Sequence, residues 1–252
     1  MRGDNMNHRN SIMILVLVLS VGISIGHAET TIDLESGLVY NSMNDVGIPG
    51  DTGTRFSLTS DFSTDLAPFL RVRVFQTLGE RHTISALYAP LEVQSSGIST
   101  RAIAFAGAVF PANTDIDGTY KFNSYRLTYR YDFVKTPANE FGMGFTAKIR
   151  DAKIALKGGG LSGEKANVGF VPIINFRYLH NFSEQFAVVF EGDALAAPQG
   201  RAEDVLLGAI YDINEKVSLK AGYRVLEGGA DNDEVYGFAL FNYAVLGLSI
   251  KL

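Results

Sequence analysis

VYGFALFNYAVLGLSIKL, residues Val235 to Leu252, is the stretch that decides the fold. Side chains of a β-strand alternate between its two faces. One face of this segment is therefore entirely apolar, with Ala244, Leu246, Leu248, Ile250 and Leu252. The other face is mixed, with Tyr243, Val245, Gly247, Ser249 and Lys251. The pattern predicts one long strand with an apolar side that ends at the last residue of the chain.

This strand resembles the C-terminal signature of Gram-negative outer-membrane β-barrel proteins. The resemblance implies that the last strand pairs with the first and helps to direct membrane assembly. It also implies the partners, namely outer-membrane lipid, lipopolysaccharide and the barrel-assembly machinery. The class usually ends in an aromatic residue, and Leu252 departs from that pattern.

The N-terminus has the pattern of a secretion signal. Basic residues precede an apolar stretch from Ile12 to Ile25, and Gly26-His27-Ala28 supplies small residues where a signal peptidase cleaves. The apolar stretch is shorter than the roughly 20 residues that a membrane-spanning helix needs. We therefore predict a signal peptide over residues 1–28 and an outer-membrane β-barrel domain over residues 29–252, located in the cell outer membrane.

Composition removes several function classes. The chain has no cysteine, which excludes a disulfide framework and thiolate metal sites. A net charge of −5 gives no basic footprint, so nucleic acid is not expected as a partner. There is no Trp, so the 11 Tyr and 17 Phe must supply the aromatic girdles of a membrane barrel.

Ten segments of the chain show the alternation of β-strands. They cover residues 31–43, 66–77, 82–94, 119–134, 140–157, 166–181, 186–195, 203–213, 217–227 and 235–252. Counted along the chain, the odd connections are long or glycine-rich and the even ones are tight. This alternation is typical of an all-β, antiparallel up-and-down transmembrane barrel with periplasmic termini. Eight and twelve strands stay open as alternatives, because residues 54–60 fit either a loop or the second strand.

Large aromatic side chains decide which face points outward. Tyr125, Leu127, Tyr129, Tyr131 and Phe133 share one face, as do Phe170, Ile174, Phe176 and Tyr178, and Phe186, Val188 and Phe190. So many rings would overfill a ten-stranded interior but suit a lipid-facing surface. The opposite faces are then predicted to line the lumen, and they carry Asp33, Glu35, Arg71, Arg73, Arg126, Arg130, Asp132, Lys148, Arg150, Arg177, Glu191, Asp193, Lys220 and Arg224.

The charged lumen admits two interpretations. In the first, the side chains pair into a salt-bridged core that plugs the barrel, because unpaired charge is costly in a poorly hydrated interior. In the second, an excess of Arg and Lys lines a narrow pore for small anionic or zwitterionic solutes. The functions expected are such a pore or a structural envelope barrel. The alternative is a plugged barrel that acts as a surface-binding or adhesion module through its loops.

An outer-membrane hydrolase is the least favoured function. Omptin proteases resemble this chain in size and strand count, but they need paired acids and a histidine at the extracellular rim. The histidines of the mature chain, His82 and His180, fall at predicted periplasmic turns. The acidic residues Asp231, Asp233 and Glu234 lack the spacing of a calcium loop. We therefore predict no enzyme activity, no cofactor and no metal site. We also predict a monomer, since a closed barrel leaves no sheet edge.

One apolar run interrupts the longest connection. Residues Ile103 to Pro111 read IAFAGAVFP and have polar neighbours on both sides. An exposed apolar patch of this size is normally costly. Two arrangements are equally favoured: the run folds into the barrel mouth, or the neighbouring strands extend beyond the membrane and pair there.

Overall fold

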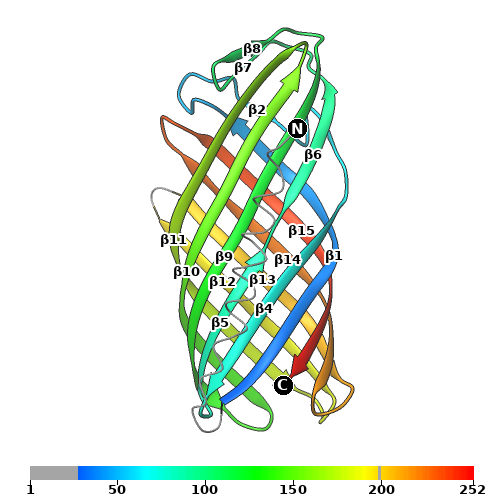
Figure 1. The fold of residues 1–252 in the computed structure, drawn as a ribbon, viewed down its shortest axis with the longest axis vertical. Coiled ribbons are helices and arrows are strands. Elements are labelled where there is room, and N and C mark those ends of the chain that lie inside the picture. The colour runs from blue at the N-terminus through cyan, green and yellow to red at the C-terminus, as the bar shows by residue number, and fades with distance from the viewer. Residues whose placement is uncertain (1–27, 198–199) are drawn as a thin grey trace, which may run out of the picture.

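The chain forms a closed antiparallel β-barrel in the computed structural model, which describes residues 28–197 and 200–252 (Figure 1). The predicted signal peptide falls almost entirely on residues 1–27, outside this part of the chain. The barrel wall consists of β1 (Ala28–Gly47), β4 (Ala67–Leu78), β5 (His82–Ala89) continued by β6 (Glu92–Ile98), β9 (Asp115–Lys135), β10 (Asn139–Gly158), β11 (Leu161–Asn181), β12 (Phe186–Ala197), β13 (Gly200–Asp212), β14 (Val217–Asp231) and β15 (Tyr236–Lys251). The predicted ten-stranded, up-and-down wall is thus confirmed.

Pairing between the last strand and the first closes the barrel. The register of β1 and β15 runs from Thr31 opposite Lys251 to Gly47 opposite Tyr236. The inward and outward faces of β15 are those expected from its alternation, because Tyr243 and Val245 are buried and Leu246 is exposed. Closure pairs the two strands that would be the edges of an open sheet.

Two details of the wall differ from the sequence prediction. The predicted strand 82–94 is interrupted at Pro90 and Leu91, and β5 and β6 both pair with β9. The connection predicted over residues 158–165 is a tight turn, with Gly159 and Gly160 both at positive φ (57° and 77°). Two residues at positive φ match the twist of a hairpin, so β10 and β11 continue up to the turn. The connections after β12 and β14 are likewise short.

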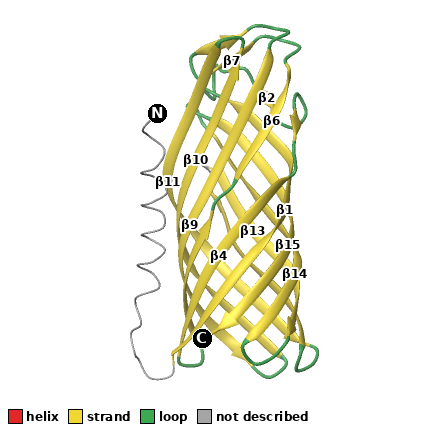
Figure 2. Cartoon of the chain, turned by 45° about the vertical axis from the view of Figure 1, so that its right-hand side comes forward, coloured by secondary structure: helices red, strands yellow, loops and turns green. Residues whose placement is uncertain are grey.

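The two ends of the barrel are unlike (Figure 2). Tight connections over residues 79–81, 136–138, 182–185 and 213–216 lie at one end, which also holds the C-terminus; we call it the turn end. The two long connections, residues 48–66 and 99–114, lie at the other end, which we call the loop end. In outer-membrane barrels short turns face the periplasm and long loops face outward.

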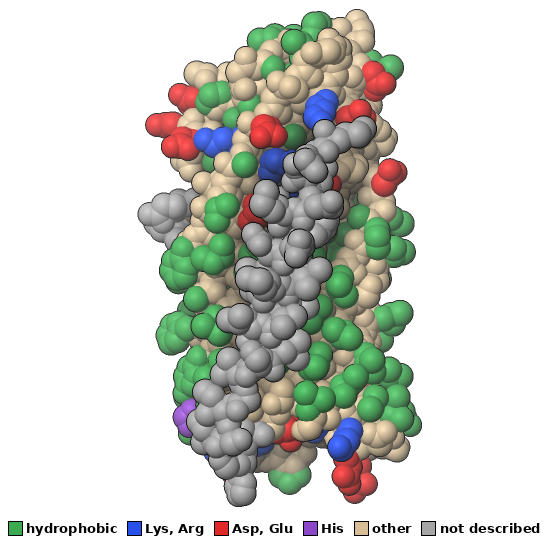
Figure 3. All heavy atoms as spheres, viewed as in Figure 1, with side chains coloured by type: hydrophobic (Ala, Val, Ile, Leu, Met, Phe, Trp, Pro, Cys, Tyr) green, Lys and Arg blue, Asp and Glu red, His purple; other side chains and the backbone are tan. Residues whose placement is uncertain are grey.

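An apolar belt surrounds the barrel between the two ends. Figure 3 shows apolar side chains over the middle of the wall and charged ones gathered toward its ends. On β9 the belt runs from Tyr125 to Phe133, and on β10 it includes Phe145, which is 74% exposed. The eight steps between these two residues, at about 3.4 Å each and tilted by about 40°, span roughly 21 Å, close to the roughly 25 Å of a lipid-facing band. No helix long and apolar enough to cross a membrane occurs in the described part of the chain.

A small apolar cap closes part of the loop end. It consists of the connections 48–66 and 99–114, which contain β2 (Phe56–Ser57), β3 (Ser63–Thr64), β7 (Ile103–Phe105) and β8 (Ala108–Phe110). Phe105 and Phe110 of the β7–β8 hairpin are buried and pack with Ile154 and Leu156 of β10. The apolar run 103–111 therefore folds into the barrel mouth. The neighbouring strands also extend to the level of this hairpin, so the two predicted arrangements occur together.

Candidate functional site: an ion-paired core below a loop-end cavity

A charge-balanced network of ion pairs fills the middle of the lumen. Its four acids and four bases come from six wall strands and are Asp33, Glu35, Asp193, Asp204, Arg71, Arg126, Lys220 and Arg224. All eight side chains are buried. Burial of charge is tolerated where each group has partners, and every member here has at least one ion pair shorter than 3.5 Å.

Asp204 is the centre of this network, although the sequence reasoning missed it. Its carboxylate accepts hydrogen bonds from Arg71 at 3.0 Å, Arg126 at 2.5 Å and Arg224 at 2.7 Å. Apart from Asp212 at its end, the rest of the inward face of β13 is apolar or small, so Asp204 gave a weak pattern. The register of the β12–β13 hairpin, which pairs Asp193 with Asp204, is the signal that could have found it.

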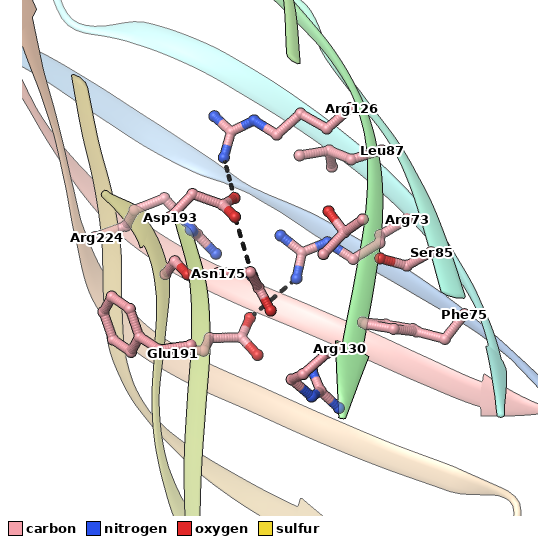
Figure 4. A pocket seen from close by; sticks show the side chains of 13 residues that line it. Arg73, Phe75, Ser85, Leu87, Arg126, Arg130, Asn175, Glu191, Asp193 and Arg224 are labelled. Carbon is pink, nitrogen blue, oxygen red and sulfur yellow. Dashed lines mark hydrogen bonds and ion pairs between the residues drawn. The ribbon is translucent and has the colours of Figure 1, made fainter. Parts of the chain in front are cut away.

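A second balanced group lies on the turn side of the first. Glu191 accepts a hydrogen bond from Arg73 at 3.3 Å, and Arg177 pairs with both Glu191 and Glu140. Asp132 accepts a bond from Arg130 at 2.9 Å. Figure 4 shows part of this region, with Asn175 donating to Asp193 beside the pair of Asp193 and Arg126. Glu140 is a further member that the sequence reasoning missed.

Little space remains at this level of the barrel. The cavity bordered by Arg73, Arg126 and Glu191 has a volume of about 10 Å³, enough for a single water molecule. Toward the loop end, a buried apolar layer that includes Phe69, Phe241 and Tyr243 covers the network. At this level, the described side chains leave no wider space, which is the arrangement that the first of the two sequence interpretations describes.

Two predicted lumen cations stay outside these networks. Lys148 and Arg150 lie on the inward face of β10, but neither has an ion pair among the described residues. Lys148 is 2% exposed, and its Nζ lies 4.8 Å from the centroid of the Phe122 ring. Arg150 donates to the side-chain oxygen of Asn167, while its Nε is buried without a partner. The other twelve predicted lumen residues join ion pairs.

Both cations line a large cavity at the loop end. Its volume is about 800 Å³, within the range of sites that hold a small organic ligand. Apolar lining residues include Ile48, Tyr120, Phe122, Ile154, Val171 and Leu195. Acidic residues occur at its rim, where Glu234 pairs with Lys165 at 3.1 Å and Glu227 pairs with Arg201.

The histidines lie where the sequence predicts, at the turn end. His82 begins β5, and its Nδ1 is 2.8 Å from the hydroxyl of Tyr129 on the outer surface. His180 lies near the end of β11, with Nδ1 2.9 Å from Oδ1 of Asn139. Ser85 is the serine nearest to His82 along β5, but its side chain lies on the inward face and that of His82 on the outer face. The two residues therefore do not form a nucleophile and its base. Within residues 28–197 and 200–252, no three His, Asp or Glu side chains cluster in a way that could hold a metal ion.

Comparisons with known proteins agree with this fold. No family model and no curated protein sequence matches the chain. Among solved structures, the outer membrane protease OmpT from Escherichia coli has a TM-score of 0.53 at 10% identity, covering 89% of this chain and 97% of its own. An outer membrane channel from Pseudomonas putida F1 has a TM-score of 0.44 at 10% identity, covering 92% and 98%. The attachment invasion locus protein Ail of Yersinia pestis has 0.41 at 9%, covering 89% and 99%.

The fold, the apolar belt and the unlike ends define the class of protein. The chain is an outer-membrane β-barrel protein of the Gram-negative type, with ten strands. At such low identity the similarity to OmpT concerns the fold alone.

Proposed function

We propose that this protein is a closed outer-membrane barrel that binds a ligand in its loop-end cavity, and that it is neither a pore nor an enzyme. The observation that carries the proposal is the contrast between two levels of the lumen. The ion-paired level leaves a cavity of about 10 Å³, whereas the loop end contains one of about 800 Å³.

The energetics of the network support a closed barrel. Opening a passage would separate buried ion pairs that link opposite walls, such as Arg126 with Asp193 and Asp204. Leaving a buried charge without its partner costs about 3–5 kcal/mol. Several such pairs would have to separate together, so an open state would be rarely populated.

Single-channel conductance of refolded residues 29–252 in a planar bilayer tests the closed state. Heat-dependent migration on a gel shows first that the barrel is folded. We expect no discrete current steps. Steps with anion preference, altered when Arg126 and Arg130 are both changed to Ala, would overturn the proposal and support a pore.

The absence of catalysis is a separate part of the proposal. At the loop end, where a surface substrate would bind, the described structure has carboxylates but no histidine, so a general base of the His-acid type is missing. Incubation of the purified barrel with peptides and with lipid A checks this, and we expect neither to be cleaved. Cleavage of either substrate would contradict a binding role.

A further inference from the structure

The wall of the barrel is incomplete beside the cavity. β11 pairs with β10 along its whole length but with β12 only from Ile174 to Asn181. The half from Leu161 to Ile173 has no partner strand on its other side among the described residues. Figure 1 shows the hairpin of β10 and β11 rising well beyond the end of β12. The loop-end half of β11 is therefore a free edge.

The sequence supplies a reason for this edge. Pro172 lies two residues beyond the last pair of the β11–β12 ladder, Ile174 with Ala194, and has no N–H to donate. Proline within a sheet is tolerated at an edge and disfavoured in a central strand. The change from a paired to an unpaired strand at this point thus agrees with the local chemistry.

The free edge lies beside the lipid-facing belt. Phe170 is in register with Ile149, and Ile149 with Tyr125, where the belt of β9 and β10 begins. On the outer face of this edge, Val168 is 68% and Phe170 64% exposed. Val171, on the inward face of the same edge, lines the cavity. The cavity therefore lies between the barrel interior and the outer apolar surface.

The unpaired positive charge of the lumen is concentrated in this cavity. The networks below it are balanced, whereas Lys148 and Arg150 have no carboxylate partner in the part of the chain that the structure describes. Lys148 is buried, so its charge needs a counter-ion or it remains costly. An anion bound between Lys148 and Arg150 would supply one, and the apolar walls above would take an apolar group.

We propose that the cavity binds a single-chain amphiphile, with its anionic head group on Lys148 and Arg150 and its chain leaving toward the membrane beside the Leu161–Ile173 edge of β11. The inference rests on the proposed function and specifies its ligand class. A carboxylate and a phosphate monoester share the chemistry that these two cations recognise.

Native mass spectrometry of the folded protein in neutral dodecyl maltoside tests the head group. Sodium dodecanoate and dodecyl phosphate should each give a one-to-one adduct, while acetate, inorganic phosphate and dodecanol should not. If acetate or inorganic phosphate is retained as well as dodecanoate or dodecyl phosphate is, the cavity is a site for small anions and does not recognise the chain. If dodecanol is retained as well as dodecanoate is, the cavity is an apolar pocket that does not recognise the anion. Either result would overturn this inference and leave the binding proposal standing. No adduct together with channel activity would overturn both.

Matched variants locate the site. Lys148→Met and Arg150→Gln should each weaken the dodecanoate adduct by about tenfold to a hundredfold, because a charged hydrogen bond is lost. Lys121→Met is the control, because Lys121 of β9 pairs with Asp151 outside the cavity. This variant should bind dodecanoate as the unchanged protein does. Without ligand, Lys148→Met should be at least as resistant to urea as the unchanged protein, since it removes a buried charge that has no partner. Unchanged binding in both cavity variants would overturn the assignment.

The route toward the membrane has an independent test, because the chain contains no Trp. A single Trp at Val171, measured in bilayers that contain dibrominated phosphatidylcholine, should be quenched nearly as strongly as one at the outward position Phe170. A Trp at Phe122, on the inward face of β9 where the pairing with β10 is unbroken, should be protected. Protection at Val171 equal to that at Phe122 would overturn membrane-side access.

Discussion

Arg126 on β9 and Asp204 on β13 are separated by three strands of the wall, yet their side chains meet at 2.5 Å in the lumen. The same guanidinium also donates to Asp193 on β12 at 2.6 Å. Contacts of this kind tie distant parts of the wall together through the interior. The charged lumen is therefore a structural core of the barrel, and the free space lies at the loop end.

The network predicts a large loss of stability when its centre is neutralised. Asp204→Asn removes the charge that faces Arg71, Arg126 and Arg224, and should lower the free energy of unfolding by about 3–5 kcal/mol. Urea unfolding in lipid vesicles, followed by far-ultraviolet circular dichroism, measures the change. Asp231→Asn, at an exposed position of the loop end, is the control and should have little effect. Equal midpoints for the two variants would show that the network does not stabilise the barrel.

The apolar belt predicts a cost for charge on the outer wall. Phe145→Arg places a cation among the lipid-facing residues and should destabilise the inserted barrel by about 2–4 kcal/mol. Leu161→Arg, beside the turn at the loop end, is the matched control and should cost about 1 kcal/mol or less. Equilibrium unfolding from vesicles gives both values. A tolerated charge at Phe145 would place this residue outside the membrane.

Barrel closure depends on a close approach at Gly37. A Cβ at this position would lie 2.1 Å from the carbonyl oxygen of Ala244 on the closing strand, and φ is +143°. We expect Gly37→Ala to reduce the fraction of protein that shows heat-dependent migration after refolding, because β1 and β15 could not keep their register. Gly237→Ala has no atom nearer than 3.7 Å to the added carbon and should refold normally. Normal refolding of Gly37→Ala would mean that the closing strands can shift to accept it.

The cap should loosen without loss of the barrel. Phe110 is fully buried in the apolar cluster of the loop end, so Phe110→Ala should cost about 3–5 kcal/mol of local packing. Limited proteolysis should then cut within residues 99–114, while heat-dependent migration stays unchanged. Val109, next to it in the same hairpin, is 61% exposed, and Val109→Ala should leave the cap resistant. A resistant cap in both variants would show that the aromatic cluster does not hold it.

Most of the wall could be predicted from the sequence, because period-2 alternation is a local property. The inward and outward positions of β9 and β15 follow directly from residues such as Tyr125 and Tyr243. The glycine-rich segment at Gly159 and Gly160 was misjudged as a loop, since glycine favours loops and also tight hairpin turns at positive φ. The interruption at Pro90 was not predicted, because the strand alternation continues on both sides of it.

The candidate site, like the wall, could be predicted only in part from the sequence. Alternation placed fourteen charged residues in the lumen, but it could not show which of them meet, since Arg126 and Asp204 are 78 positions apart. Asp204 was overlooked, because an acid on a mostly apolar face has little weight in a pattern. The cavity had no local signal, since its residues come from several strands and a free edge.

The sequence by itself determined that this chain forms a membrane barrel, since one apolar and one polar face per strand satisfy lipid and lumen at once. Only the tertiary structure decided which charged side chains pair in the lumen and where its unpaired charge remains. Closing the sheet brings strands that are remote along the chain to within hydrogen-bond distance. The balance of Asp204 against three arginines, and the isolation of Lys148 and Arg150 above them, arise only from that closure.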